Sequence, residues 1–418
     1  MSSLETRGSV RSTALFEPFK KSKYFTALYF GQIFSLFGSS ITNVILPILV
    51  LNISGSTAAM GTVMALYMLP FVIILPFSGV LVDKRNKVHI MLTMDAIRFV
   101  LMGALCALIV ADKVNMLSLY LFMLLMGAMD SFFQPAYSSV RARVFTEDIR
   151  NAANSLTQTS IQALRIFGPI AGGVLISAVS SAWGFGIDAA TYLISFLILC
   201  SMRSLTFKQA SAASGNKFSI KKDFLEGIEV LKQQDWLWLT IIAFSVINIF
   251  SGGIIRVLIP WLVNIHYKYD PVVYGTLLSA SGAGAIICGI IFGMKKKWEK
   301  RGLLAYAGVF ISGAAFLAAP FVSHLILLIV CLFVNGAGIM LFGLIWETSL
   351  QELVPEEKFG RVASLDMLGS FALLPLGYLI TGWIAESAGE ILTLLIFSLI
   401  IMAVSGILML HKGIRTFN

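Results

Sequence analysis

The sequence predicts an all-α polytopic membrane protein with twelve transmembrane helices in two pseudo-symmetric halves of six helices. Two observations lead to this fold class. First, 57% of the 418 residues are hydrophobic and only 13% are charged, whereas a soluble protein carries about 25% charged residues. Second, apolar runs of about twenty residues recur along the chain, and a helix of that length spans the roughly 30 Å hydrocarbon core of a bilayer.

Twelve apolar segments are expected to form the membrane-spanning helices. Their predicted ranges are residues 24–51, 58–82, 88–111, 116–139, 153–178, 184–202, 236–264, 272–294, 302–321, 324–346, 362–384 and 390–410. We expect tails at 1–23 and 411–418, and a linker with an amphipathic helix at 203–235, between a first half at 24–202 and a second half at 236–410. The first apolar run is too long for the core of a cleavable signal peptide.

The distribution of basic residues orients these spans. Of the 31 Lys and Arg residues, 26 lie in the tails, the linker and the alternate loops on the same side. Two lie on the other side and three lie within spans. Because cytosolic loops carry the excess of Lys and Arg, both termini and the linker are predicted to be cytosolic. Topology thus accounts for the basic excess, and the expected partner is the lipid bilayer rather than nucleic acid.

The loop between the second and third spans carries the first motif. The stretch "GVLVDKRNKV", residues 79–88, resembles the cytosolic signature loop of the major facilitator superfamily, with Gly79, Asp83, Lys84 and Lys87 in its defined positions. The resemblance implies that Asp83 accepts hydrogen bonds from free N–H groups at the start of span 11 and so holds the cytosolic gate shut. The alternative is that these charges are solvated and only set the topology.

A second motif lies in span 5. The stretch "RIFGPIAGG" contains Gly168, Pro169, Gly172 and Gly173 and resembles the antiporter motif of the drug-exporting branches of this superfamily. Small residues allow helices to pack closely and proline bends a helix, which suits a pivot between the halves. The alternative is a helix-packing motif without a mechanistic role.

Further segments narrow the resemblance to one branch. These are "FFQPA", "NSLTQTSIQALRIFGP", "IDAATYLISFLIL" and "LQELVPEEKFGRVASLD", which together resemble the branch of macrolide efflux proteins and the enterobactin exporter. The resemblance implies a monomeric secondary transporter in the cytoplasmic membrane of a bacterium. Met126 occupies the place of an arginine found in many drug:proton antiporters, which leaves the proton route open.

Charged residues inside spans are functional candidates, because each costs about 3 kcal/mol at the centre of a helix. Asp130 in span 4 and Arg165 in span 5 are expected near the midplane, where they would pair and exchange a proton as the conformation changes. The alternative is a fixed structural ion pair. Three polar side chains at similar depth favour a wet cavity; they are Gln134, Gln158 and Gln162.

Other charges receive weaker predictions. Asp95 and Arg98, three residues apart on span 3, are expected to form a structural pair, and Asp188 is expected to have a structural role. Glu347 is a second candidate for the proton site, although a position at the membrane surface is favoured for it. Arg256 would attract an anion if it faced the cavity.

Enzyme chemistry is not expected. The sequence has no phosphate-binding loop of the G-x-x-x-x-G-K-[ST] type and no metal-ligand spacing, so neither a cofactor nor a metal is predicted. The leading functional prediction is proton-coupled export of a bulky amphipathic small molecule, such as a macrolide-like drug, by alternating access. The alternatives are export of an anionic siderophore or lipid and, less favoured, a membrane sensor that transports nothing.

Overall fold

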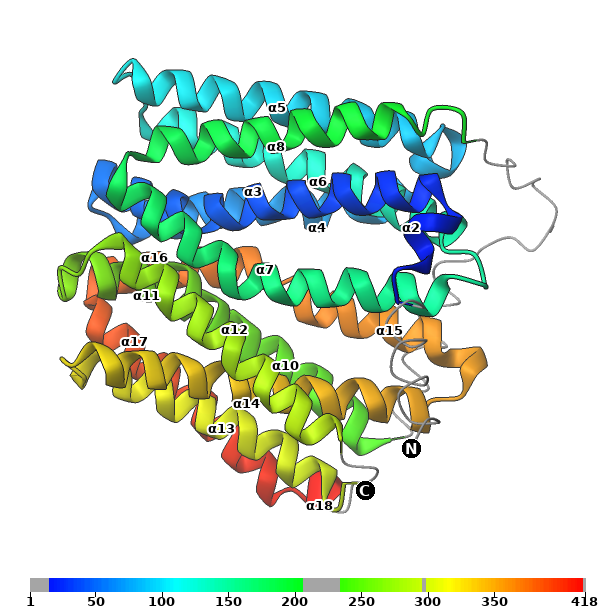
Figure 1. Ribbon diagram of the computed structural model, residues 1–418. Coiled ribbons are helices and arrows are strands. Elements are labelled where there is room, and N and C mark those ends of the chain that lie inside the picture. The colour runs from blue at the N-terminus through cyan, green and yellow to red at the C-terminus, as the bar shows by residue number, and fades with distance from the viewer. Residues whose placement is uncertain (1–14, 206–233, 295–297, 416–418) are drawn as a thin grey trace, which may run out of the picture. The chain divides into compact units, whose positions relative to one another are not determined.

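The computed structural model of the chain is helical throughout the part that it describes, which comprises residues 15–205, 234–294 and 298–415 (Figure 1). Twelve of its helical segments are long and apolar enough to cross a membrane. The predicted fold class is therefore confirmed. The longer elements are α3 (Lys23–Ser54), α4 (Thr57–Lys84), α5 (Lys87–Val110), α6 (Met116–Val144), α7 (Arg150–Ala178), α8 (Ser181–Cys200), α10 (Asp235–Gly253), α12 (Pro271–Gly293), α13 (Arg301–Ala318), α14 (Leu325–Leu353), α15 (Glu356–Phe371), α16 (Leu374–Ala388) and α17 (Glu390–Leu410).

Several helices begin where a polar side chain caps the first turn. The side-chain oxygens of Asn86, Asn115 and Asp270 accept hydrogen bonds of 2.9–3.0 Å from backbone N–H groups at the starts of α5, α6 and α12. Each such cap contributes about 1 kcal/mol. These residues therefore fix the starts of three spans that hydropathy alone locates only approximately.

Two of the predicted spans are interrupted by proline. Pro375 has no N–H to donate to the carbonyl of Phe371, and span 11 divides there into α15 and α16. In span 7, α10 is followed by η1 (Ile254–Leu258), by α11 (Ile259–Trp261), which contains Pro260, and by η2 (Leu262–His266). Both η1 and η2 are π-helical. The continuous helices predicted at 362–384 and 236–264 are therefore single spans that contain local breaks.

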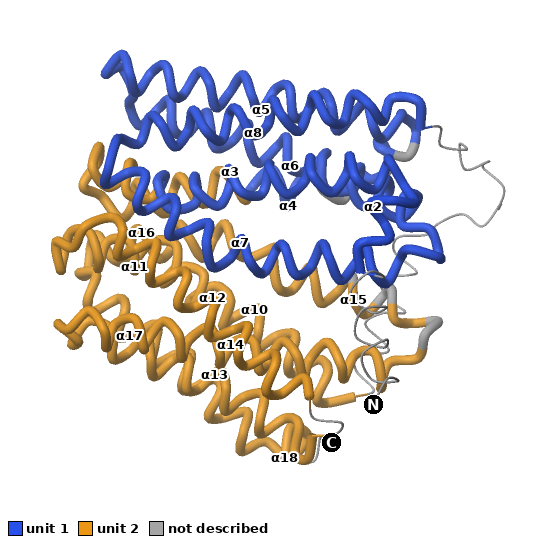
Figure 2. The backbone as a smooth tube through the Cα atoms, viewed as in Figure 1, with its two compact units in different colours: residues 1–46, 69–213 blue, residues 47–68, 214–418 orange. Residues whose placement is uncertain are grey.

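The chain forms two compact units (Figure 2). Unit 1 comprises residues 1–46 and 69–213, and unit 2 comprises residues 47–68 and 214–418. The predicted halves, 24–202 and 236–410, differ from these units in one respect, because residues 47–68 group with the later spans. The predicted linker falls largely on residues 206–233, outside the described residues.

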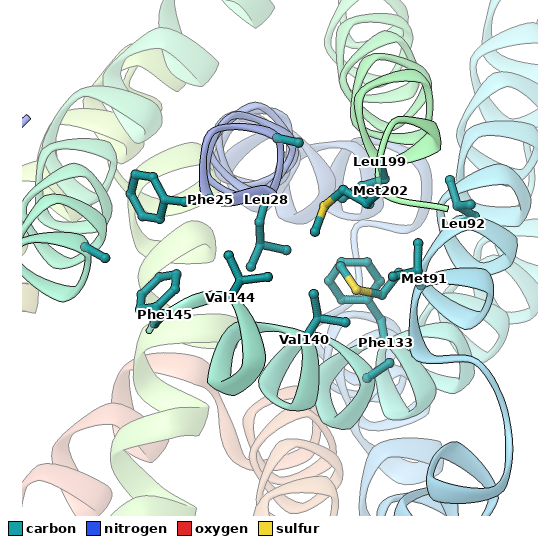
Figure 3. Packing of buried hydrophobic residues seen from close by; sticks show 14 of the residues in the cluster. Phe25, Leu28, Met91, Leu92, Phe133, Val140, Val144, Phe145, Leu199 and Met202 are labelled. Carbon is teal, nitrogen blue, oxygen red and sulfur yellow. The ribbon is translucent and has the colours of Figure 1, made fainter. Parts of the chain in front are cut away.

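The core of unit 1 joins α3 to α6 through large apolar side chains. Figure 3 shows Phe25 and Leu28 of α3 facing Val140 and Val144 of α6. The ring centroid of Phe25 lies 5.4 Å from that of Phe145, just beyond the end of α6. Side chains of α4, α5, α7 and α8 belong to the same cluster, so the helices that carry the buried charges described below are held by common packing.

The predicted antiporter motif is a close contact between α7 and α3 within unit 1. Gly168, Pro169, Gly172 and Gly173 are all buried. A Cβ added to Gly168 would overlap the side chain of Ser40, and one added to Gly172 would lie 2.9 Å from the backbone carbonyl oxygen of Ile41. The packing role of the motif is visible in these contacts, whereas its role as a pivot stays a prediction.

The two glycines give a matched test of this contact. Gly168→Ala should lower stability by about 1–3 kcal/mol through overpacking, and Ser40→Gly in the same chain should restore most of the loss, because the next atom of residue 40 lies 3.8 Å away. Gly172→Ala should lower stability similarly without rescue by Ser40→Gly, since it meets backbone. Thermal unfolding of the purified variants measures all four; rescue of both glycine variants, or of neither, would contradict the described packing.

Candidate functional site

A buried guanidinium bridges two carboxylates in unit 1. Arg98 lies in the middle of α5 and is 2% exposed. One of its terminal nitrogens lies 3.2 Å from Asp95 Oδ1, and the other donates to Asp130 Oδ1 on α6. The predicted Asp95–Arg98 pair is present, and the structure extends it to a third charge on a second helix.

The surroundings of Arg98 hold it in one orientation. Its guanidinium carbon lies 4.3 Å from the ring centroid of Phe133 and 5.5 Å from that of Tyr192, distances at which a cation is attracted to an aromatic face. The Ser195 hydroxyl of α8 donates to Asp95 Oδ2 over 2.7 Å. Two aromatic rings and two carboxylates thus hold the Arg98 side chain, and the Ser195 hydroxyl holds Asp95, with the groups supplied by α5, α6 and α8.

A second buried carboxylate connects α8 to α3. Asp188 is 0% exposed and accepts hydrogen bonds from Thr42 (2.5 Å) and Thr191 (3.3 Å). A Cβ at Gly38 would overlap both Asp188 and Thr191, so only glycine at this position leaves room for the acid. These contacts hold the two helices together, in keeping with the structural role predicted for Asp188.

The predicted partner of Asp130 was wrong. We expected an ion pair with Arg165, but the carboxylate of Asp130 instead receives Arg98, and Arg165 is exposed on α7. Arg98 and Arg165 both lie near the middle of their helices, so depth does not distinguish them as partners of Asp130. The rotation of each helix about its axis decides which arginine faces Asp130. Of the polar side chains predicted beside the pair, Gln134 and Gln158 are exposed and Gln162 is half-buried.

The signature loop lies between α4 and α5. Gly79 and Lys87 are half-buried and Lys84 is exposed. The side chain of Asp83 lies outside the described residues, so the cytosolic gate stays a prediction.

The charged residues predicted in the second half fall in unit 2. Arg256 is half-buried in η1, and Glu347 is exposed on α14. Next to Glu347 in sequence, Trp346 Nε1 donates to Asp366 Oδ2 over 3.2 Å. Among the described residues, no three His, Cys, Asp or Glu side chains form a group that could hold a metal ion.

Unit 2 also contains a carboxylate that the sequence did not single out. Glu386, near the end of α16, accepts hydrogen bonds from the Ser56 hydroxyl and from the Ala58 N–H over 2.9 Å, at the start of α4. Beside it, the Thr57 hydroxyl donates to the Gly382 carbonyl over 3.3 Å. The free N–H groups of a helix start attract a carboxylate, so this contact attaches the first turn of α4 to the last turns of α16.

Twelve candidate spans, with an ion-pair network buried in unit 1, define a polytopic membrane protein. The family model of the Major Facilitator Superfamily matches residues 28–373 and, in a second match, residues 243–415. The chain therefore belongs to the Major Facilitator Superfamily, a family of transporters and not of enzymes.

Curated relatives match over most of their length. The uncharacterized MFS-type transporter YfiS of Bacillus subtilis is 25% identical over 376 residues, with 88% of each chain covered. Macrolide efflux protein A of Streptococcus pyogenes is 22% identical over 374 residues, which cover 88% of this chain and 91% of that protein. Enterobactin exporter EntS of Shigella boydii is 24% identical over 398 residues, which cover 90% and 91%. Efflux proteins are thus among the relatives, as the sequence motifs predicted.

Solved structures show the same fold at low sequence identity. The peptide transporter POT in complex with sulfate has a TM-score of 0.71 at 14% identity and covers 93% of this chain. A bacterial homologue of the human lysosomal transporter Spinster, in an inward-facing state, also has a TM-score of 0.71 and covers 94%. These similarities establish the fold and say nothing of the cargo.

The buried network predicts an order of stabilities. Arg98→Gln leaves two adjacent carboxylates uncompensated and should cost about 3–5 kcal/mol. Asp95→Asn should cost about 1.5–3 kcal/mol, the value of a hydrogen bond to a charged group, since Arg98 retains Asp130. Asp130→Asn should cost least, because its side chain is 19% exposed whereas that of Asp95 is 0% exposed. Thermal unfolding measures the order, and an Asp130→Asn protein as unstable as Arg98→Gln would contradict it.

The contact of Glu386 predicts local protection at the start of α4. Glu386→Ala should speed amide exchange in residues 56–60 by about twofold to fivefold, because Glu386 is exposed and a charged contact at an exposed site contributes about 0.5–1 kcal/mol. Hydrogen–deuterium exchange with peptide analysis measures this, and Glu390→Ala, at the start of α17, is the matched control. Equal exchange in the two variants would show that Glu386 does not hold this turn.

Proposed function

We propose that the protein is a secondary active exporter of a bulky amphipathic small molecule, such as a macrolide-like drug. It works by alternating access as a monomer in the cytoplasmic membrane of a bacterium, with both termini cytosolic. Protons that move inward drive the export.

The observation that supports proton coupling best is the charge balance around Arg98. One guanidinium faces two carboxylates, Asp95 and Asp130, so the fully ionised trio carries one excess negative charge. Uptake of one proton removes that excess. Of the two acids, Asp130 is the accessible one, and Arg98 keeps Asp95 as its counter-charge when Asp130 becomes neutral.

A conformational change that alters the access of water to Asp130 therefore converts movement into proton uptake and release. The two-carboxylate arrangement suits this task better than the single pair that we expected with Arg165. In a single pair, each protonation leaves a buried cation without a partner, which is costly. Here the guanidinium remains paired in both protonation states of Asp130.

Export by alternating access is supported by the relatives and by the contact of Glu386. The relatives named as efflux proteins and an exporter align with nearly the whole chain. The start of α4 is joined to α16 by three hydrogen bonds, from Ser56, Thr57 and Ala58, and in this proposal these bonds break and reform as the protein alternates. Asp83, at the other end of α4, is the predicted residue of the opposite gate.

The proton gradient supplies enough energy for this task. One proton that moves down about 100 mV and one pH unit releases about 3.7 kcal/mol. At one proton per neutral substrate, that energy sustains a concentration ratio of about 500-fold. An ATP-binding site is therefore not required.

The test is transport by the purified protein in proteoliposomes with an imposed proton gradient. Wild-type protein should show gradient-driven transport of at least one compound from a panel of erythromycin, the cationic dye pyronin Y and the anionic dye fluorescein. Asp130→Asn should fold, bind the same compound and exchange it passively, while gradient-driven transport falls by about tenfold or more, since the proton site is lost.

Asp148→Asn, in the exposed loop after α6, is the matched control and should transport like wild type. Normal gradient-driven transport by a well-folded Asp130→Asn protein would overturn the assignment of the proton site, and Glu347 would be the next acid to change. Wild-type protein that transports none of the panel under a proton gradient would contradict the proposed function.

A further inference from the structure

An open groove of about 590 Å³ lies on unit 1, where the end of α8 lies beside the start of α3. Lys20 and Lys23 line it together with the aromatic rings of Phe30 and Phe34. Among the described residues that form its lining, two are cationic and none is acidic. The groove therefore combines positive charge with apolar surface, and the function proposed above assigns no role to it.

The two lysines belong to a packed corner of the chain. A short helix, α2 (Glu17–Lys21), precedes α3, and the extended backbone of Ser22 separates the two helices (Figure 1). The Ser22 hydroxyl accepts a hydrogen bond of 3.1 Å from the Phe25 N–H. The ring centroid of Phe19 lies 5.2 Å from that of Phe25 and 5.1 Å from that of Tyr29. These contacts fix α2 against α3, so both lysines extend from a backbone of defined position.

The second wall of the groove comes from α8. A Cβ added to Gly31 would lie 3.3 Å from Ser195 Oγ and 3.6 Å from the Leu199 side chain, so α8 packs closely against α3 at this level. Toward the end of α8, Ile198 and Ser201 line the groove. The Ser201 hydroxyl is exposed and has lone pairs that accept hydrogen bonds, which adds a polar group to the lining.

The lining changes from charged to apolar along one face of α3. Lys23, Ala27, Phe30 and Phe34 are separated by four, three and four residues, which is the spacing of one helix face. With a rise of about 1.5 Å per residue, the two rings lie about 10 and 16 Å beyond Lys23 along the helix. Since α3 is a candidate membrane span that begins at Lys23, the lysine is level with the lipid headgroups and the rings are level with the acyl chains.

The aromatic rings form a continuous row that a ligand can reach. Phe30 is 41% exposed and Phe34 is 40% exposed, and their ring centroids lie 6.4 Å apart. The ring of Phe19 extends the row toward the lysines, with its centroid 5.7 Å from that of Phe30. A row of this kind offers many dispersion contacts to an extended hydrocarbon chain.

The chemistry of the groove selects an anionic phospholipid. Lysines at the membrane surface attract anionic headgroups, and the stem of a lysine lies along apolar surface while its amine stays in the polar layer. A zwitterionic headgroup brings its own cation, which the two lysines repel. Because the charges and the rings belong to one groove, it accommodates the headgroup and the acyl chain of the same lipid.

We propose that this groove binds one anionic phospholipid. The phosphate of the lipid contacts Lys20 and Lys23, and one of its acyl chains lies along Phe30 and Phe34. The site is separate from the buried charges around Arg98 and does not depend on the identity of the cargo. A lipid bound here attaches the corner between α2 and α3 to the membrane surface.

The test measures the dissociation constant of the first bound lipid by native mass spectrometry of the full-length protein in detergent. It compares dioleoyl phosphatidylglycerol with dioleoyl phosphatidylcholine, which have the same acyl chains. Wild-type protein should bind phosphatidylglycerol about tenfold more tightly or better. Lys20→Gln and Lys23→Gln should each weaken phosphatidylglycerol binding about fivefold and leave phosphatidylcholine binding within about twofold.

A variant in the aromatic row tests the position of the acyl chain. Phe34→Ala should weaken the binding of both lipids by about threefold to tenfold, because it removes apolar contact that the two lipids share. The preference for phosphatidylglycerol should remain. Phe167→Ala, which changes a 66% exposed ring on α7, is the matched control and should bind both lipids like wild type. Equal affinities in Phe34→Ala and wild type would overturn the placement of the chain.

The neighbouring lysine is the matched control for charge. Lys21 is exposed and pairs with Glu17 over 3.3 Å, so Lys21→Gln changes the net charge equally and should alter phosphatidylglycerol binding by less than about twofold. A Lys21→Gln effect as large as that of Lys20→Gln, or no preference of wild type for phosphatidylglycerol, would overturn the inference.

A soluble headgroup separates a lipid site from a site for free phosphate. Glycerol 3-phosphate, which lacks the acyl chains, should not displace phosphatidylglycerol when both are present at the same concentration. Displacement at equal concentration would show that the groove binds a soluble phosphate compound and would overturn the assignment to a lipid.

Discussion

A guanidinium buried within a membrane-spanning bundle imposes the strongest constraint on this protein. Arg98 cannot be left without a counter-charge in a medium of low dielectric constant, so α5, α6 and α8 must keep their mutual positions to supply Asp95, Asp130 and Ser195. Packing of Phe133 and Tyr192 on the guanidinium adds to the same requirement. The first unit is therefore organised around a charge that apolar packing alone would exclude.

Small residues make these polar contacts geometrically feasible in both units. In unit 1, Gly38 leaves room for Asp188 against α3. In unit 2, the backbones of Gly61 and Gly382 approach each other beside the contact of Glu386, and Gly252 admits the ring of Tyr378. Helices in a membrane gain little from hydrophobic burial against one another, and they rely on close packing and hydrogen bonds. The glycines and the polar contacts are thus parts of one arrangement.

The sequence predicted the features that depend on position along the chain. It missed those that depend on the rotation of a helix about its axis or on contacts between segments far apart in the sequence. Twelve spans were predictable because bilayer thickness fixes the length of each apolar run. The Asp95–Arg98 pair was predictable because residues three apart share a helix face. The partner of Asp130 was not, since depth along a helix leaves its rotation undetermined. Glu386 contacts Ala58 across 328 residues, and its only local signal is a carboxylate at the end of an apolar span.

The two π-helical turns of span 7 have a consequence for how this span is counted. Each π turn contains about one residue more than an α-helical turn and is equivalent to an insertion into the helix. In a regular α-helix, one residue corresponds to a rotation of about 100°. The two turns at Ile254–Leu258 and Leu262–His266 therefore rotate each later residue of span 7 about the helix axis, relative to its place in a regular α-helix. Any alignment that treats span 7 as an uninterrupted helix will assign its last two turns to the wrong faces, and comparisons of cargo-binding residues between relatives must place these two extra residues first.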